Sequence, residues 1–355
     1  MKNPLSLDLE YILNSTQGLW DEIKGQRIFI TGGTGFIGCW LLESFAFANE
    51  KLNLGASTVV LTRNQGAFRK KAPHLAGNPA ISFHEGDVRY FSFPEGEFSY
   101  VIHAATDAGA KLNEENPLLM FDTIVQGTRR VLDFARASGA RKLLLTSSGA
   151  VYGKQPPHLT NVPEDYAGGP DPSDGRSAYG EGKRVAELLC NQYGRKYGIE
   201  AKIARCFAFV GPYLSLDIHY AIGNFIRNGL AGKPVHVTGD GTSYRSYLYA
   251  ADLAVWLWTI LIRGKPGTAY NVGSEEAVAI ADIAKIVTEA FSSELPVIID
   301  KKADDQIIPE RYLPSTKKAR DELGLRQEID LEDAIARTIR WHRQQLMKER
   351  HQRVN

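Results

Sequence analysis

The first half of the chain alternates short apolar runs with longer stretches of helical periodicity. Two runs rich in β-branched residues, Arg27 to Thr31 and Thr58 to Thr62, end at glycine or polar residues, as buried parallel strands do. Further strands are predicted at 81–85, 100–104, 142–147 and 200–206, and helices at 36–47, 117–138 and 177–197. Strands that alternate with helices predict βαβ units, and hence an α/β fold with a doubly wound parallel sheet.

The second half is less regular. Gly211-Pro212 and a turn at 239–241 interrupt the helical and strand patterns. A helix predicted at 252–262 is apolar enough to pack against the sheet of the first half. The segment 270–273 resembles a short strand. Further helices are predicted at 280–291 and 331–349. We therefore expect a helical extension at 1–24, a sheet domain at 25–212 with a return segment at about 245–265, and a smaller α/β C-terminal domain built from 213–244 and 266–355.

The composition and net charge of the chain argue against several classes of function. Hydrophobic residues make up 43% and charged residues 23%, which is an ordinary globular balance. The net charge of +1 provides no overall field to recruit nucleic acid or an anionic membrane. Three cysteines are too few and too scattered for a disulfide framework or a zinc site, so we expect them to be buried and reduced, and we expect no metal. Without a signal-peptide pattern or a membrane-length apolar run, we expect a cytoplasmic protein with no membrane partner.

A glycine-rich turn follows the first predicted strand. Gly32, Gly35 and Gly38 form GxxGxxG between that strand and a helix. The three glycines serve a tight turn, the close approach of a pyrophosphate, and close packing of helix on strand. The free N–H groups at the helix start, Phe36 and Ile37 among them, favour phosphate oxygens. This context predicts a dinucleotide site; the alternative is a tight turn without a ligand.

Tyr179 and Lys183 form YxxxK at the start of a long predicted helix. Residues four apart share one helical face, and a nearby ammonium favours the phenolate and lowers the pKa of a tyrosine. Such a tyrosine can exchange a proton at a sugar hydroxyl or carbonyl near neutral pH. The strand at 142–147 delivers hydroxyls to the same edge of the sheet, and we take Ser148 as the second donor, with Ser147 as the fallback.

Together these motifs resemble the extended short-chain dehydrogenase/reductase superfamily, and within it the NAD(P)-dependent nucleotide-sugar epimerase/dehydratase family. They are TGGTGFIG at 31–38, HAA at 103–105, TSSGAVYG at 146–153 and YGEGK at 179–183. The similarity continues through RCFAFVGP at 205–212, GNFI at 223–226 and GDGTSYRSYLYAADLA at 239–254. It implies a Rossmann-type fold, a substrate-binding C-terminal domain and hydride transfer at C4 of a nucleotide-diphosphate sugar.

The resemblance also implies residue roles. Tyr179 would be the acid/base, Lys183 its electrostatic support, and Ser148 the donor to the carbonyl oxygen. Lys183 can also donate a hydrogen bond to the nicotinamide ribose. Arginine suits a diphosphate because its planar fork grips phosphate oxygens in pairs. Other implied cofactor contacts are Asp87 and Val88 at the adenine and Ala104 and Ala105 of HAA; implied substrate contacts are Asn224, Arg245 and Arg311.

Some positions depart from the family pattern. Gly149 and Ala150 stand where 4,6-dehydratases carry an Asp-Glu pair, and decarboxylating relatives place a glutamate at the second of these positions. We therefore expect neither dehydration nor decarboxylation, but a 4-keto-sugar reductase or a 4-epimerase. Ala208 also replaces the family's usual asparagine. Two other readings stay open: a non-catalytic nucleotide-sensing or scaffold protein, and a reductase of a non-nucleotide ketone.

The second strand ends at Thr62 and Arg63, where NAD-preferring members carry an acidic residue. Threonine does not repel a 2′-phosphate and an adjacent arginine can pair with it, so we favour NADP over NAD. The long helices at 117–138 and 177–197 correspond to those that form the dimer interface in this family, which implies a homodimer.

Overall fold

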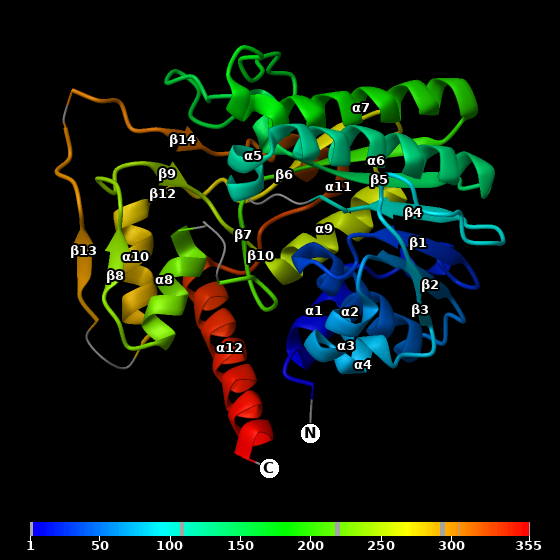
Figure 1. Cartoon of the computed structure of the whole chain (residues 1–355), viewed down its shortest axis with the longest axis horizontal. Coiled ribbons are helices and arrows are strands. Elements are labelled where there is room, and N and C mark those ends of the chain that lie inside the picture. The colour runs from blue at the N-terminus through cyan, green and yellow to red at the C-terminus, as the bar shows by residue number, and fades with distance from the viewer. Residues whose placement is uncertain (1–2, 107–109, 217–220, 292–294, 305, 355) are drawn as a thin grey trace.

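The computed structural model describes residues 3–106, 110–216, 221–291, 295–304 and 306–354. Its centre is a parallel sheet of seven strands in the order β11-β6-β5-β4-β1-β2-β3 (Figure 1). The strands are β1 (Arg27–Thr31), β2 (Ser57–Thr62), β3 (Ile81–Glu85), β4 (Tyr100–His103), β5 (Lys142–Ser148), β6 (Glu200–Cys206) and β11 (Ala269–Val272). The order reverses between β1 and β4, which is the switch point where such sheets bind ligands. The predicted Rossmann-type, doubly wound fold is confirmed.

Helices cover both faces of this sheet. On one face lie α6 (Pro117–Ala137) and α7 (Ala178–Tyr197); on the other lie α2 (Phe36–Lys51) and α9 (Ala250–Arg263) (Figure 1). Side chains alternate along a strand, so β1 serves both layers. Phe29 packs with the α6 layer, whereas Ile28 and Ile30 pack with the α2 and α9 layer. Burial on both faces explains why the strands read as continuous apolar runs.

Most predicted elements lie where the pattern indicated, and the helix ends differ from the predicted ones by a few residues in either direction. Helix α2 continues to Lys51, and α9 begins at Ala250. The pattern did not resolve several short helices, among them α3 (Gln65–Lys71), α4 (Pro73–Ala76), α5 (Ala110–Glu115), η2 (Gly149–Tyr152) and η3 (Gly175–Ser177). These carry too few turns to show a 3.6-residue period.

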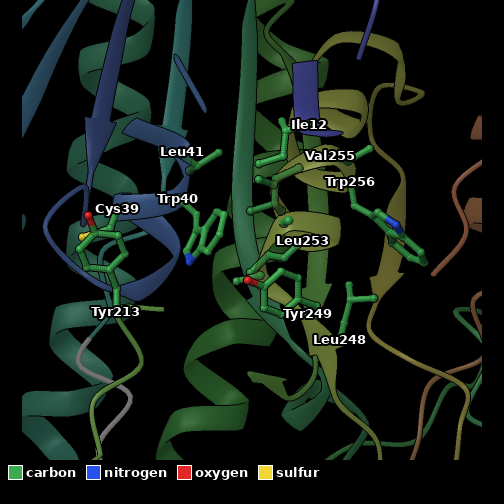
Figure 2. Close-up of a cluster of buried hydrophobic side chains, with 14 of the residues drawn as sticks. Ile12, Cys39, Trp40, Leu41, Tyr213, Leu248, Tyr249, Leu253, Val255 and Trp256 are labelled. Atoms are coloured by element: carbon green, nitrogen blue, oxygen red, sulfur yellow. The ribbon is translucent and has the colours of Figure 1, made fainter. Parts of the chain in front are cut away.

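The N-terminal extension is part of the core. Its helix α1 (Ser6–Ser15) packs on α9 and α2, and η1 (Trp20–Glu22) adds a buried tryptophan. Ile12 of α1 lies against the buried side chains of α9 (Figure 2). The Tyr11 hydroxyl donates to Asp252 at 2.5 Å, and Asp252 is fully buried. The extension therefore closes the α9 face of the sheet.

The smaller elements of the second half lie beside the sheet and are here called the lid (Figure 1). The lid comprises α8 (Ala221–Leu230), β8 (Val235–Val237), β9 (Tyr244–Arg245), β12 (Val278–Ala279), α10 (Ile280–Glu289), β13 (Val297–Ile299) and β14 (Arg311–Tyr312). Three short elements, β7 (Phe209–Val210), β10 (Leu248–Tyr249) and α11 (Lys317–Leu323), connect it to the sheet, and α12 (Leu331–Val354) ends the chain. Strand β11 joins the central sheet although it falls within 266–355, and the predicted domain boundaries stay a prediction.

The three cysteines are buried and free of disulfides. Among the helices of the described residues, none combines the length and the apolar character needed to cross a membrane.

Candidate active site

The glycine turn between β1 and α2 is packed as tightly as its sequence implies. Gly32 has φ +71°, and a Cβ there would lie 2.5 Å from the backbone carbonyl of Ala104. A Cβ at Gly38 would lie 2.3 Å from the Gly32 carbonyl oxygen. A Cβ at Gly35 would meet only that oxygen, at 3.3 Å, so the turn is open on this side. An open glycine before the first turn of α2 fits a pyrophosphate at the helix N-terminus.

The end of β4 is held against the same turn. The Ala105 N–H donates to the Thr31 hydroxyl at 3.2 Å, and that hydroxyl lies 2.7 Å from Nδ1 of His103. His103 also meets the Thr128 hydroxyl at 3.1 Å. Full burial lowers the pKa of His103 to about 3, so the ring is neutral and acts as a hydrogen-bonding spacer. The HAA segment is thus positioned at the switch point of the sheet.

The region predicted to bind the adenosine half of the cofactor contains charged side chains that the motifs did not indicate. Thr62 is buried and its hydroxyl accepts from the Asn64 N–H at 3.2 Å, whereas Arg63 is exposed. Asp87 binds the Arg89 guanidinium through both carboxylate oxygens, which lowers the pKa of Asp87, and Arg63 adds to this effect. The carboxylate is therefore ionised and already engaged.

Two residues in this region make contacts that the sequence did not reveal. The Val88 side chain is 8% exposed and lies against Gly127 of α6, so it belongs to the packing between β3 and α6. Lys71 of α3 donates to the carbonyl of Thr34, inside the glycine turn, at 2.9 Å. The sequence shows Lys71 only as one of several basic residues on a short helix, and the fold brings its ammonium to the cofactor turn.

Tyr179 and Lys183 lie one turn apart on α7, and the Lys183 ammonium is 5.9 Å from the centre of the Tyr179 ring. The Lys183 side chain is 3% exposed and donates to the Thr146 carbonyl at 2.8 Å and the Thr106 hydroxyl at 2.6 Å. Burial lowers its pKa to about 8. Thr106 was not predicted; it directly follows HAA, and only the fold places it at the lysine.

The two serines of β5 have different surroundings. The Ser147 hydroxyl donates to Glu187 at 2.5 Å, and Arg205 binds the same carboxylate, so Ser147 is tied into a buried ion pair. Ser148 ends the strand, and its hydroxyl accepts from the Ala150 N–H at 3.1 Å, which leaves its proton available to a ligand. This arrangement supports Ser148, rather than the fallback Ser147, as the second donor.

The lid brings two of the three predicted substrate residues together. Strands β9 and β14 pair in parallel, with Arg311 opposite Tyr244 and Tyr312 opposite Arg245. The Arg311 guanidinium lies 4.7 Å above the Tyr244 ring, and Arg245 donates to the Tyr244 carbonyl at 2.8 Å. Asn224 lies on α8, where it is half-buried. Two arginines on adjacent short strands form a cationic patch that suits a diphosphate.

A model of the NAD dependent epimerase/dehydratase family matches residues 28–273. The chain belongs to this family. UDP-glucuronic acid decarboxylase 6 of Arabidopsis thaliana is 32% identical over 313 residues, 88% of this chain and 87% of that protein.

Solved structures show the same fold. UDP-glucose 4-epimerase of Thermotoga maritima, with UDP-glucose, has a TM-score of 0.76 at 22% identity and covers 90% of this chain and 99% of its own. The dTDP-glucose 4,6-dehydratase of Streptomyces venezuelae, with NAD bound, has a TM-score of 0.75 at 24% identity and covers 90% and 97%. Both neighbours therefore share the fold of this epimerase/dehydratase family member.

One expectation is overturned. Decarboxylation was disfavoured because Ala150 replaces a glutamate, yet relatives that match 87–93% of the chain at 30–32% identity are UDP-glucuronic acid decarboxylases. The exclusion was wrong. Loss of carbon dioxide needs an electron sink, and a ketone at C4 of a uronic acid is β to the carboxyl group and serves as that sink.

Proposed function

We propose that this chain transfers a hydride between C4 of a nucleotide-linked sugar and a nicotinamide cofactor, with Tyr179 as the acid/base. The observation that carries the proposal is the buried Lys183 ammonium beside the Tyr179 ring, 5.9 Å from its centre. A positive charge away from water stabilises the phenolate strongly. The phenolate then takes the proton of the C4 hydroxyl.

Each residue of the site has a distinct task in this proposal. Ser148 donates a hydrogen bond to the C4 oxygen, and Lys183 holds the charge that opposes the phenolate. Arg245 and Arg311 bind the diphosphate and so hold the sugar in the orientation that the reaction needs. A nicotinamide cofactor held at the glycine turn would supply the hydride acceptor for C4. A 4-keto sugar results, and return of the hydride completes the cycle.

The fate of the 4-keto sugar depends on the substrate. The relatives named for UDP-glucuronic acid make that compound the first to test. Its 4-keto form is a β-keto acid: the bond from C5 to the carboxyl carbon breaks, its electron pair enters the C4 carbonyl, and a proton is then added at C5. Without a carboxyl group, return of the hydride to the other face of C4 gives a 4-epimer. Supply of reduced cofactor from outside gives net reduction of a 4-keto sugar.

The experiment is incubation of the protein with UDP-glucuronic acid and, separately, with UDP-glucose. Products are identified by mass spectrometry and NMR, with Tyr179→Phe as the matched control. A change at C4 or release of carbon dioxide that depends on Tyr179 supports the proposal. Binding of UDP sugars without any turnover supports the non-catalytic alternative instead.

We propose further that the cofactor site favours NADP. The relatives belong to a family described as NAD dependent, and solved neighbours contain NAD. This chain has exposed Arg63 at the end of β2 and Lys71 at the glycine turn, and both are cations that can pair with a 2′-phosphate. Thr62 places no carboxylate there to repel it.

We also propose a homodimer through α6 and α7. These helices pack against each other along one face of the molecule (Figure 1). Leu118 of α6 and Leu188 of α7 expose 77% and 57% of their surface. A four-helix interface would cover them, and light scattering at micromolar concentration tests the mass.

A further inference from the structure

The ammonium of Lys183 is held between the ends of two neighbouring strands. It donates to the carbonyl oxygen of Thr146 in β5 at 2.8 Å and to the hydroxyl oxygen of Thr106, just after β4, at 2.6 Å. The lysine is 3% exposed, so little water reaches it. The contact with Thr146 uses the backbone, which every residue type offers. The contact with Thr106 uses a side chain and therefore depends on which residue stands at position 106.

The hydroxyl of Thr106 is oriented as an acceptor for this ammonium. Its own hydrogen is donated to the carbonyl oxygen of Ala105, 2.8 Å away. A hydroxyl has one hydrogen and two lone pairs, whereas an ammonium group can only donate. The oxygen of Thr106 therefore presents a lone pair to Lys183. A bond of this kind is stronger with the charged ammonium than with the neutral amine, and so favours the charged form.

The segment that carries Thr106 is fixed by the glycine turn. A Cβ at Gly32 would lie 2.5 Å from the carbonyl carbon of Ala104 and 2.6 Å from the nitrogen of Ala105. The Ala105 N–H also donates to the hydroxyl of Thr31, at the end of β1, at 3.2 Å. The residue before Thr106 is thus held by backbone packing that does not involve α7. The acceptor is therefore in place independently of the helix that carries the lysine.

We propose that Thr106 is a positioning residue for the acid/base chemistry, whose hydroxyl keeps the Lys183 ammonium charged beside Tyr179. This rests on the function proposed above, because Thr106 acts there only through the lysine. Taking an ammonium group out of water is costly, and each hydrogen bond to the charged form offsets part of that cost. Loss of the bond from Thr106 lowers the pH at which Lys183 gives up its proton. The upper pH limit of turnover falls with it.

The other titratable groups around the ammonium keep their charge over this range. Besides Tyr179, they are Glu187, Cys190, Cys206 and His103. Burial raises the pKa of both thiols, to about 12 for Cys206, and lowers the pKa of the histidine to about 3. The carboxylate is held in an ion pair. A charge change on this side of the site between about pH 6 and about pH 9 therefore belongs to the lysine or to the tyrosine that it supports.

The pKa of Lys183 is measured directly and without turnover. In protein labelled with carbon-13 at the lysine ε-carbons, each chemical shift follows the charge of its own amine, and Lys183→Met identifies the signal by its loss. Burial lowers the wild-type pKa to about 8. We expect Thr106→Val to lower the midpoint further by about one to two pH units, because a hydrogen bond to a charged group is lost. Thr106→Ser keeps the hydroxyl and should restore most of the difference.

Thr259→Val is the matched control, because it makes the same change at a buried threonine of α9 whose hydroxyl bonds within its own helix. It should leave the midpoint of Lys183 unchanged. Thr106→Ala replaces Thr106→Val if the latter fails to fold, and should also lower the midpoint. The alkaline limb of kcat/KM for a UDP sugar is recorded on the same variants and should move in parallel.

The outcomes separate this inference from the proposed function. If Thr106→Val lowers turnover or stability while the midpoint of Lys183 stays at its wild-type pH, Thr106 is a packing residue, and the inference fails while the proposed function stands. If Thr106→Ser shifts the midpoint as far as Thr106→Val does, the hydroxyl is not the cause and the inference fails as well. If wild type turns over no nucleotide sugar at any pH, the proposed function fails and this inference fails with it.

Discussion

The buried ammonium of Lys183 donates a hydrogen bond to the carbonyl oxygen of Thr146, 2.8 Å away. This bond ties helix α7 to strand β5, two residues before Ser148. The proposed acid/base and the proposed hydroxyl donor are thus held by one contact between the helix and the sheet.

Tyr179→Phe should remove turnover and leave the fold and cofactor binding intact. The phenol is the only group of Tyr179 that exchanges a proton, and loss of an acid/base group lowers the rate by about two to four powers of ten. Turnover of a UDP sugar and the melting temperature are measured on the same preparation. Retention of more than about a tenth of the activity would rule out this role.

The pH dependence of kcat/KM should show the state of Lys183. Burial lowers its pKa to about 8, so the ammonium is present below that pH and is lost as the pH rises through it. The phenolate then loses its electrostatic support, and kcat/KM should fall with a midpoint near pH 8. Besides Tyr179, the titratable groups that interact electrostatically with the ammonium are Glu187 and Cys190 on α7, Cys206 on β6 and His103 on β4.

Lys183→Met is the control for this profile. It should lower kcat/KM at every pH and abolish the alkaline limb, because the side chain no longer titrates. A wild-type profile that stays flat to about pH 10, near the ordinary value for lysine, would contradict the assignment.

Arg245→Ala should raise KM for a UDP sugar by about 10- to 100-fold, because a charged hydrogen bond to phosphate is lost. Cofactor affinity should be unchanged, since Arg245 lies on the lid strand β9. Initial rates and cofactor titrations are compared with Lys285→Ala, an exposed lysine on α10 of the same lid. An equal loss of cofactor affinity would assign Arg245 to the fold or to the cofactor site.

Wild type should bind NADP more tightly than NAD, and Arg63→Ala and Lys71→Ala should each weaken NADP by about tenfold. The NAD affinity should change little, because NAD lacks the 2′-phosphate. Fluorescence titration of wild type and of both variants with each cofactor measures these affinities. Exposed Lys70, next in sequence to Lys71, supplies the control Lys70→Ala. If wild type binds NAD at least as tightly, net reduction loses its support and a retained cofactor is favoured.

Tyr11→Phe should lower the free energy of unfolding by about 1.5–3 kcal/mol at pH 7.5, where Asp252 is ionised and loses a buried donor. Burial raises the pKa of Asp252 to about 6, so the folded chain takes up this proton before the unfolded chain does. The contribution of Asp252 to stability is therefore present below its unfolded value near 4 and is lost as the pH rises through 6.

The cost of Tyr11→Phe should accordingly be smaller at about pH 5, where the carboxyl group is largely protonated. Urea unfolding at the two pH values measures the difference. Tyr193→Phe, which removes a hydroxyl from a less buried partner, Asp133, should show a weaker pH dependence. An equal cost of Tyr11→Phe at both pH values would show that Asp252 does not titrate in this range.

Local pattern was enough to predict the sheet and the first half of the site. Each central strand is buried on both faces, so its apolar run and the glycine or polar residues after it are visible in a short window. The glycine turn and YxxxK are also short motifs, because the residues of each lie within a few positions of one another in the sequence. Gly32, Tyr179 and Lys183 could therefore be selected from sequence alone.

The lid and the aromatic neighbours of the serine could not be selected in this way. Strands β9 and β14 have two residues each, too few to show alternation, and they pair across a separation of more than sixty residues. The attempt to decide the reaction from Gly149 and Ala150 failed for a related reason. It compared side chains by position in the chain, whereas the fold brings the Tyr312 hydroxyl from the lid against Gly149.

The sequence by itself determined the order of strands and helices, the glycine turn and the spacing of Tyr179 and Lys183, because these depend on contacts between residues close in the chain. The tertiary structure alone decided that Lys71 lies at the glycine turn, that Thr106 meets Lys183, and that Tyr312 reaches Gly149. Each of these contacts joins residues that are distant in sequence. Their proximity follows from how the whole chain packs, and no local window carries that information.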